Sequence, residues 1–134
     1  MIGQKLAASA GAAILAGLML FQILLALGYP LGKAAWGGYY TELPAGLRLA
    51  SVLTAALYAA FISITLASAR MVRAPFGPRF IRLSLWTLTA LFFLGTLMNL
   101  ASQSVLERTI MTPLAFMLSI CCYSLARHTQ RAFF

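Results

Sequence analysis

Four apolar segments, each about as long as a membrane-spanning helix, constrain this chain more than any other feature of its sequence. They cover roughly residues 6–27, 47–69, 83–101 and 105–125. A helix needs about 20 apolar residues to cross the hydrocarbon layer, and in lipid only helices and closed barrels satisfy the backbone hydrogen bonds. Because the segments lack the alternating polarity of barrel strands, they predict an all-α, polytopic membrane protein. Residues 1–134 are expected to form a single domain, a bundle of four transmembrane helices.

The composition supports the same prediction. Hydrophobic residues make up 62% of the chain and charged residues 9%, whereas soluble domains contain roughly 45–50% apolar and about 25% charged residues. A chain of 134 residues cannot bury that much apolar surface in one soluble core. Lipid is therefore expected to surround part of the protein.

The strong positive charge, +8 at pH 7, suggests two kinds of partner. In a soluble protein it would favour nucleic-acid binding, but no basic patch is interleaved with aromatic residues here. The cations instead flank the apolar segments, where they anchor helices and meet anionic lipid headgroups. We expect membrane lipids as partners, with anionic headgroups at the loop from Arg70 to Arg82, and no nucleic acid.

The distribution of cations predicts the orientation of the bundle. If successive connections lie on opposite sides, one side holds Lys5, Arg70, Arg73, Arg79, Arg82, Arg127 and Arg131. The other side holds Lys33, Arg48 and Arg108, together with the acidic residues Glu42 and Glu107. Cytoplasmic loops carry the excess of Lys and Arg. Both termini are therefore expected in the cytoplasm.

A cleaved secretory signal peptide is the alternative interpretation of the first segment. Lys5 could supply its positive charge, and residues 26–28, Ala-Leu-Gly, form a passable cleavage site. The apolar stretch is longer than the roughly 7–15 residues usual in such peptides, which favours a retained first helix.

Residues at the segment ends predict where the helices begin and bend. Ser104 and Glu107 have the spacing of a capping box, in which the serine caps the helix and the glutamate reaches back to it. Pro113 lies inside the fourth segment, where it should remove a backbone hydrogen bond and bend the helix. Small residues recur every four positions and predict close helix packing: Ser9, Ala13 and Gly17 in the first segment, and Ala55, Ala59, Ser63 and Ala67 in the second.

Few side chains could support catalysis, a cofactor or a metal ion. Metal and haem sites need grouped ligands, and the chain has one histidine, His128, in its C-terminal tail. Cys121 and Cys122 are adjacent, so on a helix they point about 100° apart and cannot act as a C-x-x-C redox pair. Proton-coupled pumps place carboxylates within the membrane, whereas both carboxylates here are predicted at helix ends. We expect no catalytic residues, no metal and no cofactor, and leave enzyme activity open.

Polar residues gather toward the predicted outer side. Asn99, Ser102 and Gln103 follow an i, i+3, i+4 spacing, which would place them on one face of the third helix. Gln22 lies at a depth similar to that of Asn99, and buried amides need partners. The candidate outer pocket consists of Gln22, Trp36, Arg48, Ser51, Asn99, Ser102, Gln103, Glu107 and Arg108.

Two interpretations of this cluster remain open. In the structural one, its members form interhelical hydrogen bonds, and Arg48 pairs with Glu107, one of only two acidic residues. In the functional one, they line an outward-facing pocket. The aromatic loop of residues 29–46 is either an interfacial belt or a re-entrant lid over the pocket, with Gly37 and Gly38 as its hinge.

Two sets of short motifs carry a resemblance to other sequences. Residues 27–38 read LGYPLGKAAWGG and precede Leu43-Pro44, Arg48 and Ser51, while residues 99–102 read NLAS and precede Glu107, Arg108 and Pro113. This arrangement, which covers nearly the whole chain, resembles a group of small uncharacterised bacterial four-helix membrane proteins. The resemblance implies a bacterial inner membrane and no particular activity.

The expected function follows from what the sequence offers and lacks. We expect a small integral membrane protein of non-catalytic type, with an accessory or structural role, that binds lipid or a protein partner. A transporter or channel subunit with an outward-facing polar pocket is the first alternative, and it would have to form a homo-oligomer because so small a bundle has no polar path through its middle. A membrane enzyme acting on a lipophilic substrate is the second alternative.

Overall fold

Four long helices make up most of the computed structural model, in which residues 2–132 are described, without the side chains of residues 2 and 130–132. The helices are α1 (Ile2–Ala26), α2 (Ala45–Ser68), α3 (Pro78–Leu100) and α4 (Thr112–Ala132). Two short 3-10 helices, η1 (Gly32–Ala34) and η2 (Trp36–Gly38), lie between α1 and α2, and a π-helix, η3 (Glu107–Met111), leads into α4. The predicted all-α class is confirmed. The side chain of Arg131, one of the cations used to predict orientation, lies outside the described part.

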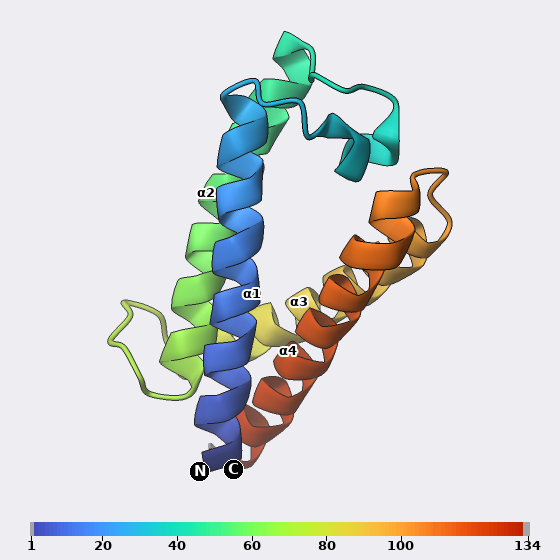
Figure 1. The fold of residues 1–134 in the computed structure, drawn as a ribbon. Coiled ribbons are helices and arrows are strands. Elements are labelled where there is room, and N and C mark those ends of the chain that lie inside the picture. The colour runs from blue at the N-terminus through green and yellow to red at the C-terminus, as the bar shows by residue number, and fades with distance from the viewer. Residues whose placement is uncertain (1, 133–134) are drawn as a thin grey trace.

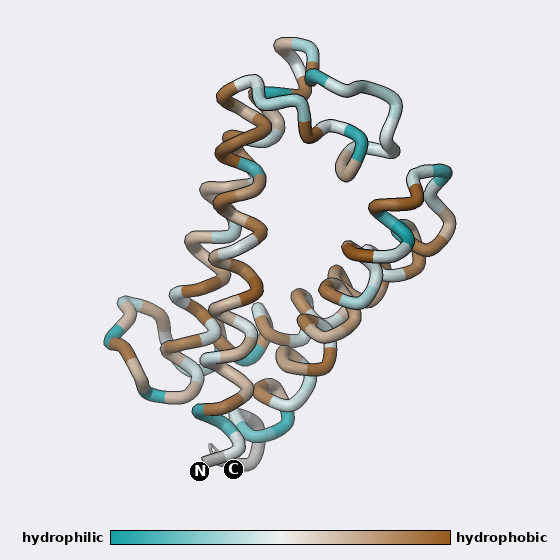
Figure 2. Tube along the Cα trace, in the orientation of Figure 1, coloured by the Kyte–Doolittle hydropathy of each residue, from teal (hydrophilic) through white to brown (hydrophobic). Residues whose placement is uncertain are grey.

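Each long helix is suited to crossing a membrane. The four apolar spans, Gly3–Ala26, Ala45–Ser68, Pro78–Leu100 and Glu107–Thr129, contain 23 or 24 residues each. At 1.5 Å per residue they are about 35 Å long, which exceeds the roughly 30 Å of the hydrocarbon layer. In Figure 2 hydrophobic residues follow the helices, while hydrophilic residues gather in the loops and near the helix ends. The chain is a small multi-pass membrane protein.

The helix bounds depart from the predicted ones where hydropathy is a poor guide. α3 begins at Pro78 rather than near residue 83, because proline suits the first position of a helix and Gly77 precedes it in an extended conformation. α4 continues to Ala132 rather than ending near residue 125. An apolar segment ends at the first polar side chains, whereas a helix can continue through polar residues.

The helices form two hairpins, α1–α2 and α3–α4, that meet at one end of the molecule and diverge toward the other (Figure 1). Packing is extensive within each hairpin, and α1 and α4 make the main contact between them. The start of α1, the end of α4 and the loop of residues 69–77 lie at the closed end, which we call the terminal end. The connection of residues 27–44, which we call the long loop, lies at the open end, the loop end.

Two apolar clusters join the hairpins where they meet. One consists of Ala8, Ile64, Ala69, Leu85, Leu125 and Ala126, and the other of Leu15, Leu88, Phe92, Leu118 and Cys122. Cys122 is fully buried and packs as a small hydrophobic side chain, as expected. A third cluster, of Leu25, Ala35 and Leu43, packs the long loop against the end of α1.

The small-residue stripe predicted on α1 does not face the other helices. Ser9, Ala13 and Gly17 are exposed, while Ala8 and Leu15 are fully buried. Helix association in lipid depends on van der Waals packing, and the larger leucine side chains on the neighbouring face supply more of it. A four-residue spacing alone could not determine which face of α1 turns inward.

Candidate ligand-binding site

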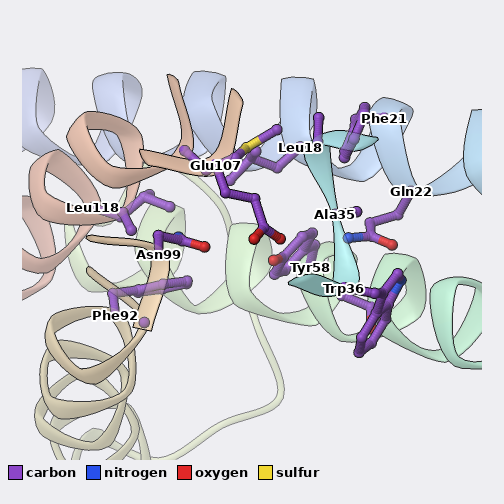
Figure 3. A pocket seen from close by; sticks show the side chains of 15 residues that line it. Leu18, Phe21, Gln22, Ala35, Trp36, Tyr58, Phe92, Asn99, Glu107 and Leu118 are labelled. Carbon is purple, nitrogen blue, oxygen red and sulfur yellow. The ribbon is translucent and has the colours of Figure 1, made fainter. Parts of the chain in front are cut away.

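A cavity of about 240 Å³ lies between the two hairpins (Figure 3). Residues of all four helices, of η3 and of the long loop form its wall. The apolar part of the wall consists of Leu18, Phe21, Ala34, Ala35, Phe92, Gly95, Met111, Ala115 and Leu118. The polar part consists of Gln22, Trp36, Thr54, Tyr58, Asn99 and Glu107. An apolar pocket with a few convergent polar groups is the usual composition of a small-molecule site.

Glu107 supplies the only acidic group among the lining residues. Glu107 is only 6% exposed, so of the two cases left open by the sequence, a buried and an exposed glutamate, the structure shows the buried one. One carboxylate oxygen accepts a hydrogen bond from the Gly37 N–H at 3.1 Å, and the other accepts one from the Ser102 hydroxyl. In Figure 3 the carboxylate points into the cavity between Asn99 and Tyr58. Ionisable groups buried in membrane proteins are rare and usually functional.

The turn before η3 explains why the Glu107 side chain points inward. Half of the predicted capping box forms, since the Ser104 hydroxyl accepts a hydrogen bond from the Glu107 N–H at 3.3 Å. In the other half, Ser102 takes the place of the glutamate: its hydroxyl oxygen accepts from the Ser104 N–H at 3.1 Å. The carboxylate is therefore not needed to cap the turn and can reach the cavity.

Pro113 accounts for the irregular start of the fourth span. Because proline has no N–H, it cannot continue the regular helical hydrogen bonding, and the π-helix η3 ends two residues before it. The N–H and the hydroxyl of Thr112 both donate to the Glu107 carbonyl, the hydroxyl at 3.1 Å. The sequence predicted a bend at Pro113; what the structure shows is a π-helix at the cavity wall, a feature frequent at functional sites.

The long loop bridges the two hairpins at the loop end (Figure 1). On one side, the Trp36 indole N–H donates to the hydroxyl of the fully buried Ser51 on α2, at 3.2 Å. On the other side, the Ser104 hydroxyl donates to the Lys33 carbonyl, beside the bond from the Gly37 N–H to the carboxylate. The loop is therefore fixed to both hairpins across the space that separates them.

The backbone of this loop has an unusual conformation next to the cavity. Trp36, Gly37 and Gly38 have consecutive positive φ values of 51, 82 and 77°. A bulky residue rarely adopts this conformation, which costs on the order of 1–3 kcal/mol and persists only where its surroundings impose it. A Cβ atom on Gly38 would lie 2.7 Å from the Ser104 Cβ, so the glycine lets the loop rest on the tip of the α3–α4 hairpin.

The predicted ion pair between Arg48 and Glu107 does not form in the described part of the chain. Arg48 lies in the first turn of α2, and its guanidinium covers Gly28, on which a Cβ atom would lie 1.8 Å from an Arg48 Nη. Its Nε is buried and has no hydrogen-bond partner among the described residues. The ion pair does not form because the hydrogen-bond donors to Glu107 come from the nearby loop and turn. The Arg48 guanidinium lies instead against the end of α1.

The remaining predicted residues divide between the cavity and the surface. Gln22 and Asn99 line the cavity, and the Gln22 Oε1 is buried without a partner in residues 2–132. Gln103 and Arg108 are exposed and do not line it. The expectation that Asn99, Ser102 and Gln103 share one helical face is wrong, because α3 ends before Ser102.

The candidate pocket predicted from the sequence left out two polar residues of the cavity and most of its apolar wall. Thr54 and Tyr58 follow Ser51 by three and seven positions, so all three lie on one face of α2 and could have been included. Apolar residues such as Phe92 and Leu118 gave no comparable signal, because a cavity wall and a packed core have the same composition.

Known proteins give no closer identification of this site or of the chain. Compared with models of protein families, with curated proteins and with solved structures, the chain matches none. Its description as a small multi-pass membrane protein therefore depends on the four spans, and the resemblance carried by its motifs stays a prediction.

Proposed function

We propose that this protein is a non-catalytic membrane component that binds a lipophilic molecule in the cavity between its hairpins. The observation that carries the proposal is the placing of polar groups in an otherwise apolar cavity. Buried polar atoms in a purely structural cluster are expected to pair with one another. Here the Gln22 Oε1 has no partner in the described residues, and the Glu107 carboxylate, which accepts only two hydrogen bonds, lines the cavity. Such an arrangement costs free energy, which a ligand would recover.

The dimensions of the cavity indicate what it could hold. Its volume of about 240 Å³ is below the roughly 300–1,000 Å³ of pockets for drug-sized ligands. A head group and a short apolar chain would fit, with any longer chain extending between the diverging hairpins. The polar side chains would contact the head group, and the walls from Phe92 and Leu118 would contact the chain.

An oligomeric transporter subunit is a second candidate, favoured by the conformation of the long loop. Three consecutive residues of the loop have positive φ values, and hydrogen bonds hold the loop to both hairpins. If these hydrogen bonds were broken, the loop would uncover the cavity. Under this alternative the loop is a gate, and a homo-oligomer supplies the path across the membrane that one small bundle lacks.

We place the loop end outside the cytoplasm, on the periplasmic side of a bacterial inner membrane. The excess of Lys and Arg at the terminal end supports this orientation. Reporter fusions within residues 71–76 and at the C-terminus should read cytoplasmic, and a fusion at Tyr40 in the long loop should read periplasmic. A periplasmic C-terminus would contradict the orientation, and a disagreement between the two cytoplasmic sites would show that one span does not cross.

Filling the cavity should prevent a lipophilic probe from entering it. On Gly95, which lines the cavity on α3, a Cβ atom would meet nothing within 4 Å. The variant Gly95→Leu should therefore fold and occupy the cavity. We expect a diazirine-labelled octanol to label cavity residues of the wild type, and at least fivefold less in Gly95→Leu, as mapped by mass spectrometry.

The matched control is Gly17→Leu. Gly17 is exposed on α1, outside the cavity, and a Cβ atom there also meets nothing within 4 Å. This variant should label like the wild type. Wild-type labelling confined to the exposed faces of the helices, with none in the cavity, would refute the proposed binding.

A further inference from the structure

Resting on the proposed function, we infer that the head group bound in the cavity is positively charged, an alkylammonium ion whose nitrogen contacts the Glu107 carboxylate. The inference deepens the proposal by naming the class of ligand. It depends on the charge of the cavity, on the acceptors that line it and on the absence of an internal counter-ion among the described residues.

The first step is that no cation of the described residues neutralises Glu107. Three cations lie toward the loop end. The Lys33 ammonium donates to a backbone carbonyl of the long loop at 3.3 Å, the Arg48 guanidinium lies against the end of α1, and Arg108 is exposed. The carboxylate is buried, and its hydrogen bonds come from neutral groups, the Gly37 N–H and a serine hydroxyl.

The second step is that the Glu107 carboxylate has free acceptor positions next to the cavity. Both hydrogen bonds are donated to the carboxylate, and the residue lies near the start of a helix, where the macrodipole stabilises anions. A carboxylate offers about four acceptor positions, and these bonds use only two of them. The carboxylate also lines the cavity, where the other positions can meet a ligand.

The third step is that the rest of the cavity suits an ammonium group with an alkyl chain. The Gln22 side chain lines the same cavity from α1. The rings of Trp36 and Tyr58 also line the cavity, and aromatic faces attract cations. The apolar wall of the cavity would contact the alkyl chain of the ligand. An anionic head group would meet the carboxylate and be repelled, while an alcohol would lack the attraction between opposite charges.

The test compares three probes of equal chain length that differ in head-group charge. Purified full-length protein in the uncharged detergent dodecyl maltoside is titrated with octylammonium, 1-octanol or octanoate. Trp86→Phe leaves Trp36, one of the two tryptophans, as the fluorescent reporter in the cavity wall. We expect octylammonium to bind at least about tenfold more tightly than octanol, a ratio that corresponds to 1.4 kcal/mol, and octanoate not to saturate.

Two glutamine variants show which carboxylate is responsible. Glu107→Gln keeps the size of the side chain and an acceptor for Gly37 but removes the charge. It should weaken octylammonium binding at least about tenfold and remove the preference for octylammonium over octanol. Glu42→Gln removes the other acidic side chain, which is exposed in the long loop. It should keep the wild-type preference.

The outcomes separate this inference from the proposed function. Equal wild-type affinities for octylammonium and octanol, or a preference that survives in Glu107→Gln, would overturn the cation inference and leave cavity binding intact. If no probe saturates and the photoprobe labels no cavity residue, the proposed function itself fails. The wild-type comparison decides the question even if Glu107→Gln does not fold.

A competition arm identifies the source of the ammonium group. Dihexanoyl phosphatidylethanolamine presents the same group on a lipid, and its displacement of octylammonium would assign the site to a lipid head group. Failure to displace octylammonium would assign it to a free alkylamine. Either result is compatible with recognition of the cation by Glu107.

Discussion

Replacing Gly38 with alanine is expected to release the long loop from the tip of the α3–α4 hairpin. Gly38 has a φ of 77°, and a Cβ atom there would lie 2.7 Å from the Ser104 Cβ and 3.1 Å from the Lys33 carbonyl oxygen. The left-handed conformation alone costs an alanine roughly 1–2 kcal/mol, and the steric overlap adds to this. We expect a local loss of about 2–4 kcal/mol, which would raise amide hydrogen exchange in residues 31–42 at least tenfold.

Gly46→Ala is the matched control for this substitution. Gly46 lies in the first turn of α2, and a Cβ atom there meets nothing within 4 Å. Alanine should stabilise this helix by about 0.5–1 kcal/mol and leave exchange in the long loop unchanged. Unchanged exchange in Gly38→Ala would show that the loop does not rest on the hairpin tip. Equal effects of the two variants would show that the increase in exchange does not depend on the contact at Gly38.

The sequence predicts the spans well and the arrangement of the hairpins poorly. Helix class and number follow from the apolar segments, because lipid forces the backbone to pair internally. The divergence of the hairpins depends on which helix faces pack, and α1 illustrates why that could not be predicted. Its alanine, glycine and serine stripe is exposed, and the packed face carries Ala8 and Leu15 instead. A spacing of small residues and a face with larger apolar side chains can both pack helices in lipid, so the sequence alone does not say which face turns inward.

At the candidate site, the polar residues could be predicted but their pairing could not. Gln22, Trp36, Asn99 and Glu107 were expected in an outer pocket, and the structure places all four around one cavity. The pairing of Arg48 with Glu107 was inferred from the scarcity of acidic residues. A carboxylate does not require a cation, because backbone N–H and hydroxyl donors also satisfy it. Those donors come from a turn and a loop. The sequence of these segments has no periodic pattern from which their conformation could be predicted.

Removing the Glu107 side chain is expected to cost more stability than removing any other polar side chain that lines the cavity. In Glu107→Ala, the Gly37 N–H and the Ser102 hydroxyl lose their acceptor, and each unsatisfied buried donor costs about 1–3 kcal/mol. Removing a buried charge offsets part of this cost. We expect a net loss of about 2–3 kcal/mol in the free energy of unfolding, measured by denaturant titration in mixed micelles. Arg48→Ala should cost less than about 1 kcal/mol, because its buried Nε has no partner in the described structure to lose.

Double-mutant cycles can decide which residue Glu107 interacts with. Coupling with Ser102, measured through Ser102→Ala, should reach about 1 kcal/mol, because the two side chains share a hydrogen bond. Coupling with Arg48 should stay below about 0.5 kcal/mol, as for residues without shared partners. An Arg48–Glu107 coupling above about 1.5 kcal/mol would mean that the two charges pair in the membrane. Glu107 would then have an internal counter-ion, and its cavity would not be expected to attract an ammonium ion.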